Sequence, residues 1–313
     1  MSCSPGPTSS DLRSVRHALR RWAWAAVAAT AIAATAATTP TSAATPSPAA
    51  TPTPTVAPSP TYAPEILLGK VSHLSSSRIT ESSGIAASYT YPDVGYTLND
   101  NSEARPTVYS FRISTGELLG KTELPYSKRG NTESIYADPK GRLWVGDLGD
   151  NEGKRTDAAI IRFTEPGPGN RPPAGLTRFP VRYSDGKPNV EAMLVNPMND
   201  QVFLIAKQES SRTRLYRLPT TLVAGRTNLA KPTRVSMPAR VSDGVLSRDG
   251  RLAVVRTDDN IQFFRTSAWN RVAVFDVPAL TNPESVTIEP GQTTFLFGSE
   301  GKNSPVYRYP MPS

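Results

Sequence analysis

Asn131-Thr132-Glu133-Ser134-Ile135 is the stretch that decides the fold, because its plan of an acidic residue, a small residue and an apolar strand occurs five times. The other copies are Thr80-Glu81-Ser82-Ser83-Gly84-Ile85, Asn189-Val190-Glu191-Ala192-Met193, Val241-Ser242-Asp243-Gly244-Val245 and Asn282-Pro283-Glu284-Ser285-Val286. The acids stand 52, 58, 52 and 41 residues apart. A period near 50 residues, with alternating and turn-rich text between the copies, is typical of β-propeller blades rather than of helical solenoids.

Each repeat divides into four expected strands separated by turn residues. In the second repeat these are residues 133–137, 143–146, 158–163 and 177–183, and in the fourth they are 244–247, 252–256, 261–265 and 272–277. The last repeat has only three, at 284–288, 294–298 and 306–309, so we expect the strand-like piece Ile66–Val71 to supply the fourth. The sequence therefore predicts an all-β fold, a five-bladed β-propeller closed by its N-terminal strand pairing with the last blade. Six blades are the alternative, if the 58-residue interval holds a degenerate one.

The N-terminus has the pattern of an export signal. Four arginines against one acid precede the apolar run Trp22–Ala37, which is 16 residues long and shorter than the roughly 20 residues of a membrane-spanning helix. Small residues at 42–44 offer a cleavage site, with an uncleaved N-terminal anchor as the alternative. We expect a signal peptide at 1–44, a disordered linker rich in Pro, Thr and Ala at 45–64, and a propeller domain at 65–313. The protein is then secreted, either extracellular or associated with the cell envelope, and its mature chain has no transmembrane segment.

Composition excludes several functions. Cys3 lies in the signal, so the mature chain has neither a disulfide nor a thiol nucleophile. The formal charge of +8 falls to +5 for residues 65–313, because the first 64 residues carry four Arg and one Asp. The remaining Lys and Arg are scattered, which argues against nucleic-acid binding. We expect a monomer that has a small polar or anionic ligand as its partner.

The candidate site is the mouth of the central channel, where the start of each innermost strand and the loop after each second strand meet. Converging carboxylates repel one another, and a divalent cation with oxygen ligands, calcium rather than zinc, would neutralise them. The candidate metal ligands are Glu81, Glu133, Asp147, Asp150, Asn151, Glu191 and Glu284. The competing interpretation is structural: each recurring acid accepts hydrogen bonds from the neighbouring blade and joins the two.

The loops after the second strands supply the remaining candidates. The segment Gly146–Arg155 occurs in full only in the second repeat, and it is either a functional loop or an Asx-rich turn that caps a hairpin. Paired-carboxylate chemistry would use Glu133, Glu191 or Asp150 as the catalytic base. The candidate ligand-binding residues are Asn99, Asp100, Arg105, Arg155 and Lys207. A Ser-His-Asp triad is disfavoured, because His73 is the one histidine outside the signal and no serine has the Gly-x-Ser-x-Gly context.

Four phrases resemble secreted bacterial propellers related to phytase-like and esterase-like propeller proteins. They are Glu81-Ser82-Ser83-Gly84-Ile85, Leu98-Asn99-Asp100-Asn101, Glu133-Ser134-Ile135 and Gly146-Asp147-Leu148-Gly149-Asp150-Asn151. Asp138-Pro139-Lys140-Gly141-Arg142-Leu143-Trp144 is similar, more distantly, to NHL and gluconolactonase-type propellers. The lactonase resemblance implies a metal held by Glu81 or Glu133 with Asn99 or Asn151. The phytase-like resemblance implies calcium beside a phosphate, with Arg105, Arg155 and Lys207 as the basic residues.

Three functions stay open on these observations. The leading hypothesis is a secreted propeller whose acidic mouth binds a divalent cation and a small polar ligand, without assured catalysis. The first alternative is a metal-dependent hydrolase of phosphate esters or lactones that uses the same mouth. The second is a cell-envelope interaction module held out on the Pro-rich linker.

Overall fold

The structure, a computed structural model, describes residues 69–100, 105–126, 131–209, 211–278 and 280–312. The expected signal peptide at 1–44 and linker at 45–64 lie outside the described residues. The described part contains twenty β-strands and no helix, which confirms the all-β prediction, and it therefore holds no helix that could span a membrane.

The twenty strands form antiparallel four-stranded groups. The first group is β2 (Ser82–Ala87), β3 (Val94–Asn99), β4 (Thr107–Arg112) and β5 (Leu118–Glu123). The second is β6 (Thr132–Asp138), β7 (Arg142–Asp147), β8 (Ala159–Thr164) and β9 (Thr177–Tyr183). The third is β10 (Val190–Val195), β11 (Val202–Ala206), β12 (Thr213–Arg217) and β13 (Asn228–Met237). The fourth is β14 (Val241–Leu246), β15 (Leu252–Thr257), β16 (Asn260–Arg265) and β17 (Asn270–Asp276). The last is β18 (Pro283–Ile288), β19 (Thr294–Ser299), β20 (Ser304–Pro310) and β1 (Gly69–Leu74).

Hydrogen bonding gives four sheets where the repeats predict five separate units. The outer strands β9 and β13 pair in parallel, with Asn228–Ala230 opposite Val181–Tyr183, and this contact joins the second and third groups into one eight-stranded sheet. The physical reason is the length of β13, which at ten residues outruns its antiparallel partner β12. The backbone groups of its first residues then form hydrogen bonds with the neighbouring edge strand β9.

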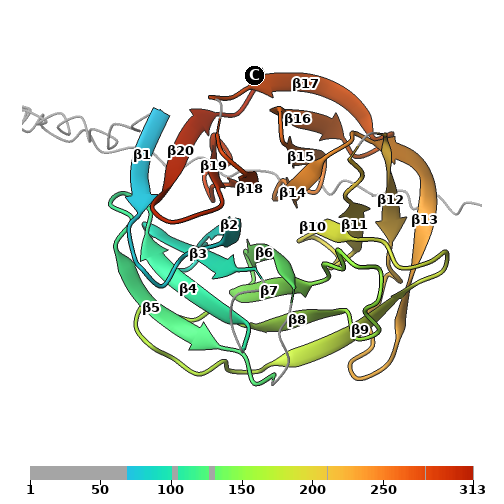
Figure 1. Ribbon diagram of the computed structural model, residues 1–313, viewed down its shortest axis with the longest axis horizontal. Helices are drawn as coiled ribbons and strands as arrows, with labels where there is room; N and C mark the ends of the chain where they lie inside the picture. The colour runs from blue at the N-terminus through green and yellow to red at the C-terminus, as the bar shows by residue number, and fades with distance from the viewer. Residues whose placement is uncertain (1–68, 101–104, 127–130, 210, 279, 313) are drawn as a thin grey trace, which may run out of the picture. The chain divides into compact units, whose positions relative to one another are not determined.

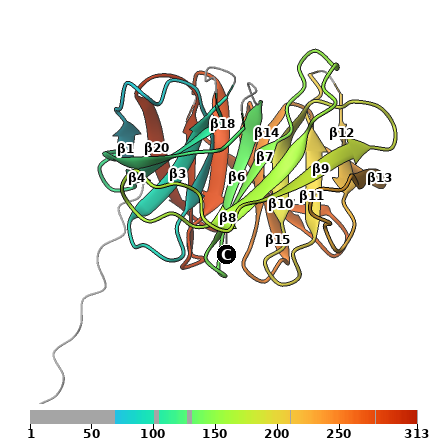
Figure 2. The ribbon, with the colours of Figure 1, turned by 90° about the horizontal axis from the view of Figure 1, so that it is seen from below.

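The innermost strands contact one another in a closed cyclic order, β2–β6–β10–β14–β18 and back to β2. Figure 1 shows these five strands at the centre of a ring, and Figure 2 shows the ring from the side. All six residues of β2, β10 and β14 are buried, because neighbours cover both of their faces, whereas the outer strand β17 has no buried residue. Each repeat thus begins at the centre and ends at the rim.

The N-terminal strand closes the ring. β1 pairs antiparallel with β20, from Gly69 opposite Arg308 to Leu74 opposite Ser304, with a bulge between Lys70 and Ser72. Pairing with the C-terminal sheet was predicted for Ile66–Val71; the observed strand runs three residues later, and residues 66–68 lie outside the described part. Since β20 would otherwise present an unpaired edge, this contact protects it.

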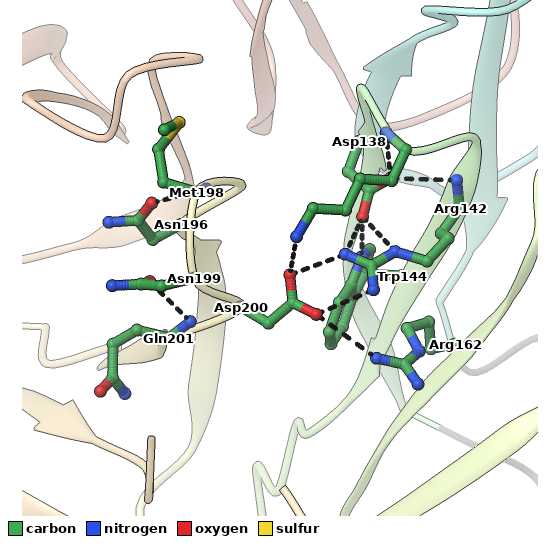
Figure 3. Close-up of polar contacts among 10 residues, drawn as sticks. Asp138, Arg142, Trp144, Arg162, Asn196, Met198, Asn199, Asp200 and Gln201 are labelled. Carbon is green, nitrogen blue, oxygen red and sulfur yellow. Dashed lines mark hydrogen bonds and ion pairs between the residues drawn. The ribbon is translucent and has the colours of Figure 1, made fainter. Parts of the chain in front are cut away.

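A polar cluster links the second and third groups at the end of the ring opposite the acid phrases (Figure 3). Asp138, in the turn before β7, accepts hydrogen bonds from Trp144 Nε1 at 2.8 Å and Arg142 Nε at 2.7 Å. Arg142 also reaches across to both carboxylate oxygens of Asp200, at 2.7 and 2.8 Å. The guanidinium of Arg162 lies 5.0 Å from the Trp144 ring centre. The turn Asp138-Pro139-Lys140-Gly141 is therefore both the local hairpin turn and a contact between repeats.

Candidate functional site

Glu133 and Glu191 form a buried carboxyl pair at the centre of the ring. Each is 4 % exposed, and they stand near the starts of the adjacent inner strands β6 and β10. Burial, and then the charge of Glu191, raises the pKa of Glu133 well above its ordinary value. Burial also raises the pKa of Glu191, against the opposing effect of Lys207. Burial and the repulsion between two close carboxylates both favour the protonated form of a carboxyl.

Two further contacts fix the pair. Ser83 Oγ, on the preceding inner strand β2, donates to Glu133 Oε2 at 3.0 Å. Asn189 Nδ2 donates to Glu191 Oε1 at 2.7 Å. Because one carboxylate oxygen of each residue already has a protein donor, the orientations of both side chains are set before any ligand arrives.

Lys207 brings a positive charge to this pair. It follows β11, and its Nζ lies 3.9 Å from Glu191 Oε1. Its pKa is raised: burial lowers it, but the surrounding acids Glu191, Glu284 and Asp258 outweigh that effect. The side chain of Lys207 remains 23 % exposed. The predicted ligand-binding lysine therefore does face the acid cluster, and it is charged there.

Glu284 completes the cluster from β18. Its Oε2 is buried without a hydrogen-bond partner among the described residues. Burial raises the pKa of Glu284 to about 8, although Lys207 opposes this, so the carboxyl is largely protonated at pH 7. It can donate or accept one proton close to neutral pH.

Asp243, the acid of the fourth repeat, has a structural role instead. It is 1 % exposed, and its carboxylate accepts hydrogen bonds from Ser134 Oγ at 3.2 Å, Gly244 N at 2.8 Å and Val286 N at 2.9 Å. These donors lie on β6, β14 and β18, so one side chain ties three inner strands together. The interpretation that a recurring acid joins its neighbours holds for Asp243.

The predicted loop Gly146–Arg155 is closed by its own contacts. Asp147 Oδ1 accepts from Asn131 N at 2.9 Å and from Arg155 Nη2 at 2.7 Å. Asp150 uses both oxygens to cap the backbone amides of Lys154 and Arg155, at 2.8 and 2.9 Å. Arg155 was expected to meet an anionic ligand, but its anionic partner is Asp147 of the same loop. Asp150 was expected to act as a base, but its carboxylate is already engaged as an Asx-type cap.

Asn151 and the candidates of the first repeat stand apart from the carboxyl pair. Asn151 is exposed, and its Oδ1 accepts from Asn189 Nδ2 at 2.7 Å. Asn99 is buried and holds the backbone of residues 78–81 through three hydrogen bonds of 2.8 to 3.2 Å. Asp100 follows it, half-buried, and contributes to the raised pKa of Glu133. Arg105 is exposed, and Glu81 has one buried carboxylate oxygen, Oε2, without a hydrogen-bond partner in the described part.

Arg256 is a residue that the sequence reasoning missed. It is fully buried on β15, and its guanidinium lies 5.6 Å from the Phe297 ring centre. None of its three side-chain nitrogens has a hydrogen-bond partner among the described residues. Burial lowers its pKa to about 10, against the opposing charges of Asp258 and Glu284. An arginine directly after the apolar run Leu252–Val255, within the same expected strand, was the available signal, because charged residues are rarely fully buried without a partner.

A cavity of about 500 Å³ opens beside the carboxyl pair. Asn131 and the loop residues Gly149–Asn151 line it, together with Glu152, Lys154 and Arg155. Gly149 separates the cavity from Glu133: a Cβ there would clash with the side chains of Asn131 and Glu133. The volume lies within the usual range of small-molecule sites.

The seven predicted metal ligands do not form one coordination site. In the described part of the chain, no group of three or more His, Cys, Asp or Glu side chains is placed to hold a metal ion. Asp147 and Asp150 have protein donors on their oxygens, and Lys207 supplies positive charge beside Glu191.

The comparisons with known proteins assign no family. No protein family model matches the chain, and no curated protein matches it in sequence. One solved structure that resembles it is from Bacteroides uniformis, of a protein provisionally named a 6-phosphogluconolactonase. It has 12 % sequence identity and a TM-score of 0.40, over 76 % of this chain and 70 % of that chain. At this level the similarity supplies no argument about activity or ligand.

Proposed function

We propose that the chain is an exported five-bladed β-propeller whose axial carboxyl cluster binds a small polar ligand. The cyclic order of the inner strands and the four-stranded groups that follow each acid phrase support five blades. The even division of the described strands among these groups favours five blades over six. The parallel contact of β9 and β13 is then a link between the rims of two blades. Export rests on the N-terminal sequence pattern alone.

The observation that carries the ligand proposal is the Glu133–Glu191 pair beside Lys207. This arrangement offers the ammonium donor of Lys207 and two carboxyl groups, which accept hydrogen bonds when ionised and donate one when protonated. A hydroxyl-rich or carbonyl-bearing ligand that reached the cluster would have partners of each kind. Lys207, at 23 % side-chain exposure, is the member that reaches solvent.

The carboxyl pair also supports hydrolysis as a second candidate function. Because burial raises the pKa of Glu133 well above its ordinary value, while Lys207 opposes the rise for Glu191, Glu133 would act as the acid and Glu191 as the base. The acid would protonate the leaving oxygen of an ester or lactone, while the carboxylate takes a proton from the attacking water. Lys207 would stabilise negative charge that develops on the substrate carbonyl.

The experiment is a turnover assay with 4-nitrophenyl acetate, 4-nitrophenyl phosphate and glucono-δ-lactone on the purified mature chain. We expect Glu191→Gln to lower kcat/KM at least 100-fold on the substrate that is turned over, because Gln cannot act as a base. Glu117→Gln is the matched control, with the same substitution at an exposed position before β5. Inactivity on all three substrates, or equal activity of Glu191→Gln and wild type, would refute the hydrolase.

Ligand binding is tested separately by calorimetric titration with gluconate and glucose. We expect Lys207→Met to abolish binding of a sugar or sugar acid that the wild type binds. If neither compound binds, or Lys207→Met binds as well as wild type, the ligand proposal fails, and the interaction module on the linker at 45–64 becomes the favoured function.

Calcium binding stays a prediction that the same protein can test. If calcium binds, millimolar Ca²⁺ should raise the thermal unfolding temperature by several degrees and EDTA should reverse the rise. An unfolding temperature that neither Ca²⁺ nor EDTA changes would contradict the prediction.

A further inference from the structure

A second cavity, of about 940 Å³, lies at the end of the ring opposite the acid cluster. β14 runs from Val241 to Leu246, so Asp243 stands near one end of the strand and the turn Ser247–Arg251 follows the other. This turn lines the cavity, together with Thr266 and Ser267 from the turn between β16 and β17, and Met311 near the C-terminus. None of the residues proposed above for the axial site takes part.

The walls of the cavity are held by hydrogen bonds within and between repeats. Ser247 Oγ donates to Asp249 Oδ1 at 2.6 Å, and Thr266 Oγ1 donates to the Gly250 carbonyl at 2.7 Å. Arg248 N donates to Gln292 Oε1 at 2.8 Å, which ties the turn to the next repeat. The cavity is therefore formed by fixed turns, and a ligand would not have to order them.

Positive charge predominates on the lining. Arg248, Arg251 and Arg265 face one acid, Asp249. The ion pair between Arg251 and Asp249 is long, 3.9 Å, and both side chains are mostly exposed, so it is weak. Within the described part of the chain, no carboxylate pairs with the side chain of Arg248 or Arg265. Two guanidinium groups are thus available to an anion, which they can bind through paired N–H donors.

The lining also has an apolar part beside its neutral polar residues. Met198 is 69 % exposed, the highest value among the exposed large hydrophobic side chains, and it stands on the turn between β10 and β11 (Figure 3). Leu252 and Met311 also line the cavity, and both are half-buried. Methionine adapts its shape to different apolar surfaces, which suits contact with an aromatic or aliphatic group.

We propose that this cavity is a binding site for a small organic anion that joins a phosphate or carboxylate group to an apolar group. Arg248 and Arg265 bind the anionic group, and Met198, Leu252 and Met311 contact the apolar part. The site is separate from the axial cluster, so the full chain has two independent ligand sites at opposite ends of the ring.

The test is calorimetric titration of the full mature chain with phenyl phosphate, inorganic phosphate and phenol. We expect phenyl phosphate to bind at least tenfold more tightly than either inorganic phosphate or phenol, because it alone uses both parts of the lining. The double variant Arg248→Glu/Arg265→Glu should weaken phenyl phosphate binding at least tenfold. Met198→Ser should reduce the preference of phenyl phosphate over inorganic phosphate.

The matched control is Arg226→Glu/Arg234→Glu, which makes the same change of net charge at exposed positions outside the cavity. It should retain wild-type binding, and so should Glu191→Gln in the axial cluster. The proposal is overturned if the control weakens binding as much as the cavity variant does, since the effect would then be general electrostatics. It is also overturned if phenyl phosphate shows no preference over inorganic phosphate. Thermal unfolding of every variant confirms that a loss of binding is not a loss of folding.

Discussion

Replacing Asp200 tests whether ion pairs between repeats stabilise the ring. Both carboxylate oxygens of Asp200 bind the Arg142 guanidinium, and Oδ1 also accepts from Lys140 Nζ at 2.7 Å (Figure 3). These donors, the Arg142 hydrogen bonds first, lower the pKa of Asp200 from 3.8 to about 2. Asp200 has a φ of 59°, a left-handed conformation that Asn tolerates well. Asp200→Asn therefore removes the charge without forcing the backbone to change.

The magnitude follows from the pKa. A difference of nearly two units between the pKa values of the folded and unfolded states corresponds to about 2.5 kcal/mol for a group that is fully shielded from solvent. The side chain of Asp200 is 28 % exposed, and solvent screening reduces the contribution to about 1–2 kcal/mol. Because the folded-state pKa is the lower one, this stability is present above the unfolded-state pKa near 4 and is lost as the pH falls toward 2.

Urea unfolding of wild type and Asp200→Asn at several pH values measures the effect. At pH 7 the free energy of unfolding of the variant should be lower than that of wild type by about 1–2 kcal/mol. This difference should shrink between pH 4 and pH 2.5. Asp276→Asn, at an exposed position on β17, is the control and should change stability by less than about 0.5 kcal/mol. A difference that is equally large at pH 7 and pH 2.5 would refute the assigned cause, because it could not then arise from the carboxylate charge.

Three further predictions concern the ring and its centre. Asp243→Ala should lower the free energy of unfolding by about 2–4 kcal/mol in urea, because it leaves three buried donors without an acceptor; a loss below about 1 kcal/mol would contradict the joining role. Glu284 has a raised pKa in the folded state, so its contribution to stability is full below pH 4 and is lost as the pH rises through about 8. Glu284→Gln should therefore flatten the fall in stability between pH 5 and pH 8, and an unchanged pH profile would contradict this. Deleting residues 1–74 exposes the β20 edge and should lower the unfolding temperature and increase light scattering, whereas a chain that begins at residue 65 should behave as the mature protein does.

Much of the strand order could be predicted because local chemistry specifies it. The second repeat was expected at 133–137, 143–146, 158–163 and 177–183, and the observed strands β6 to β9 match it within one or two residues. Turn residues such as those at 138–141 fix where each hairpin reverses, and alternation fixes which side chains point inward. The pairing of β9 with β13 could not be predicted, since nothing local to either strand specifies a partner on another repeat's rim.

The site was predictable in its residues and less so in their roles. Glu133, Glu191 and Lys207 do meet, because the repeat brings the starts of the inner strands together. Arg155 and Asp150 carry the right chemistry for a ligand site, yet their side chains fold back onto their own loop. The direction in which a side chain points depends on tertiary packing. Short polar side chains in loops often form hydrogen bonds with nearby backbone groups. Arg256 was missed because the apolar residues before it indicate a strand, whereas the burial of its guanidinium without a hydrogen-bond partner among the described residues is visible only in the folded ring.

Recurrence of the acid along the chain does not imply one role at all five positions. Asp243 has three donors on its two oxygens, so its carboxylate has little left to offer a ligand. Glu133 and Glu191 have one side-chain donor apiece, Ser83 and Asn189, and burial raises the pKa of both. The longer Glu side chain places its carboxyl one carbon further from the backbone than Asp does. The shorter Asp243 therefore keeps its carboxyl close to the backbone amides of Gly244 and Val286, whereas Glu133 carries its carboxyl toward Glu191. Glu133→Asp should therefore weaken ligand binding, and Asp243→Glu should lower the folding stability.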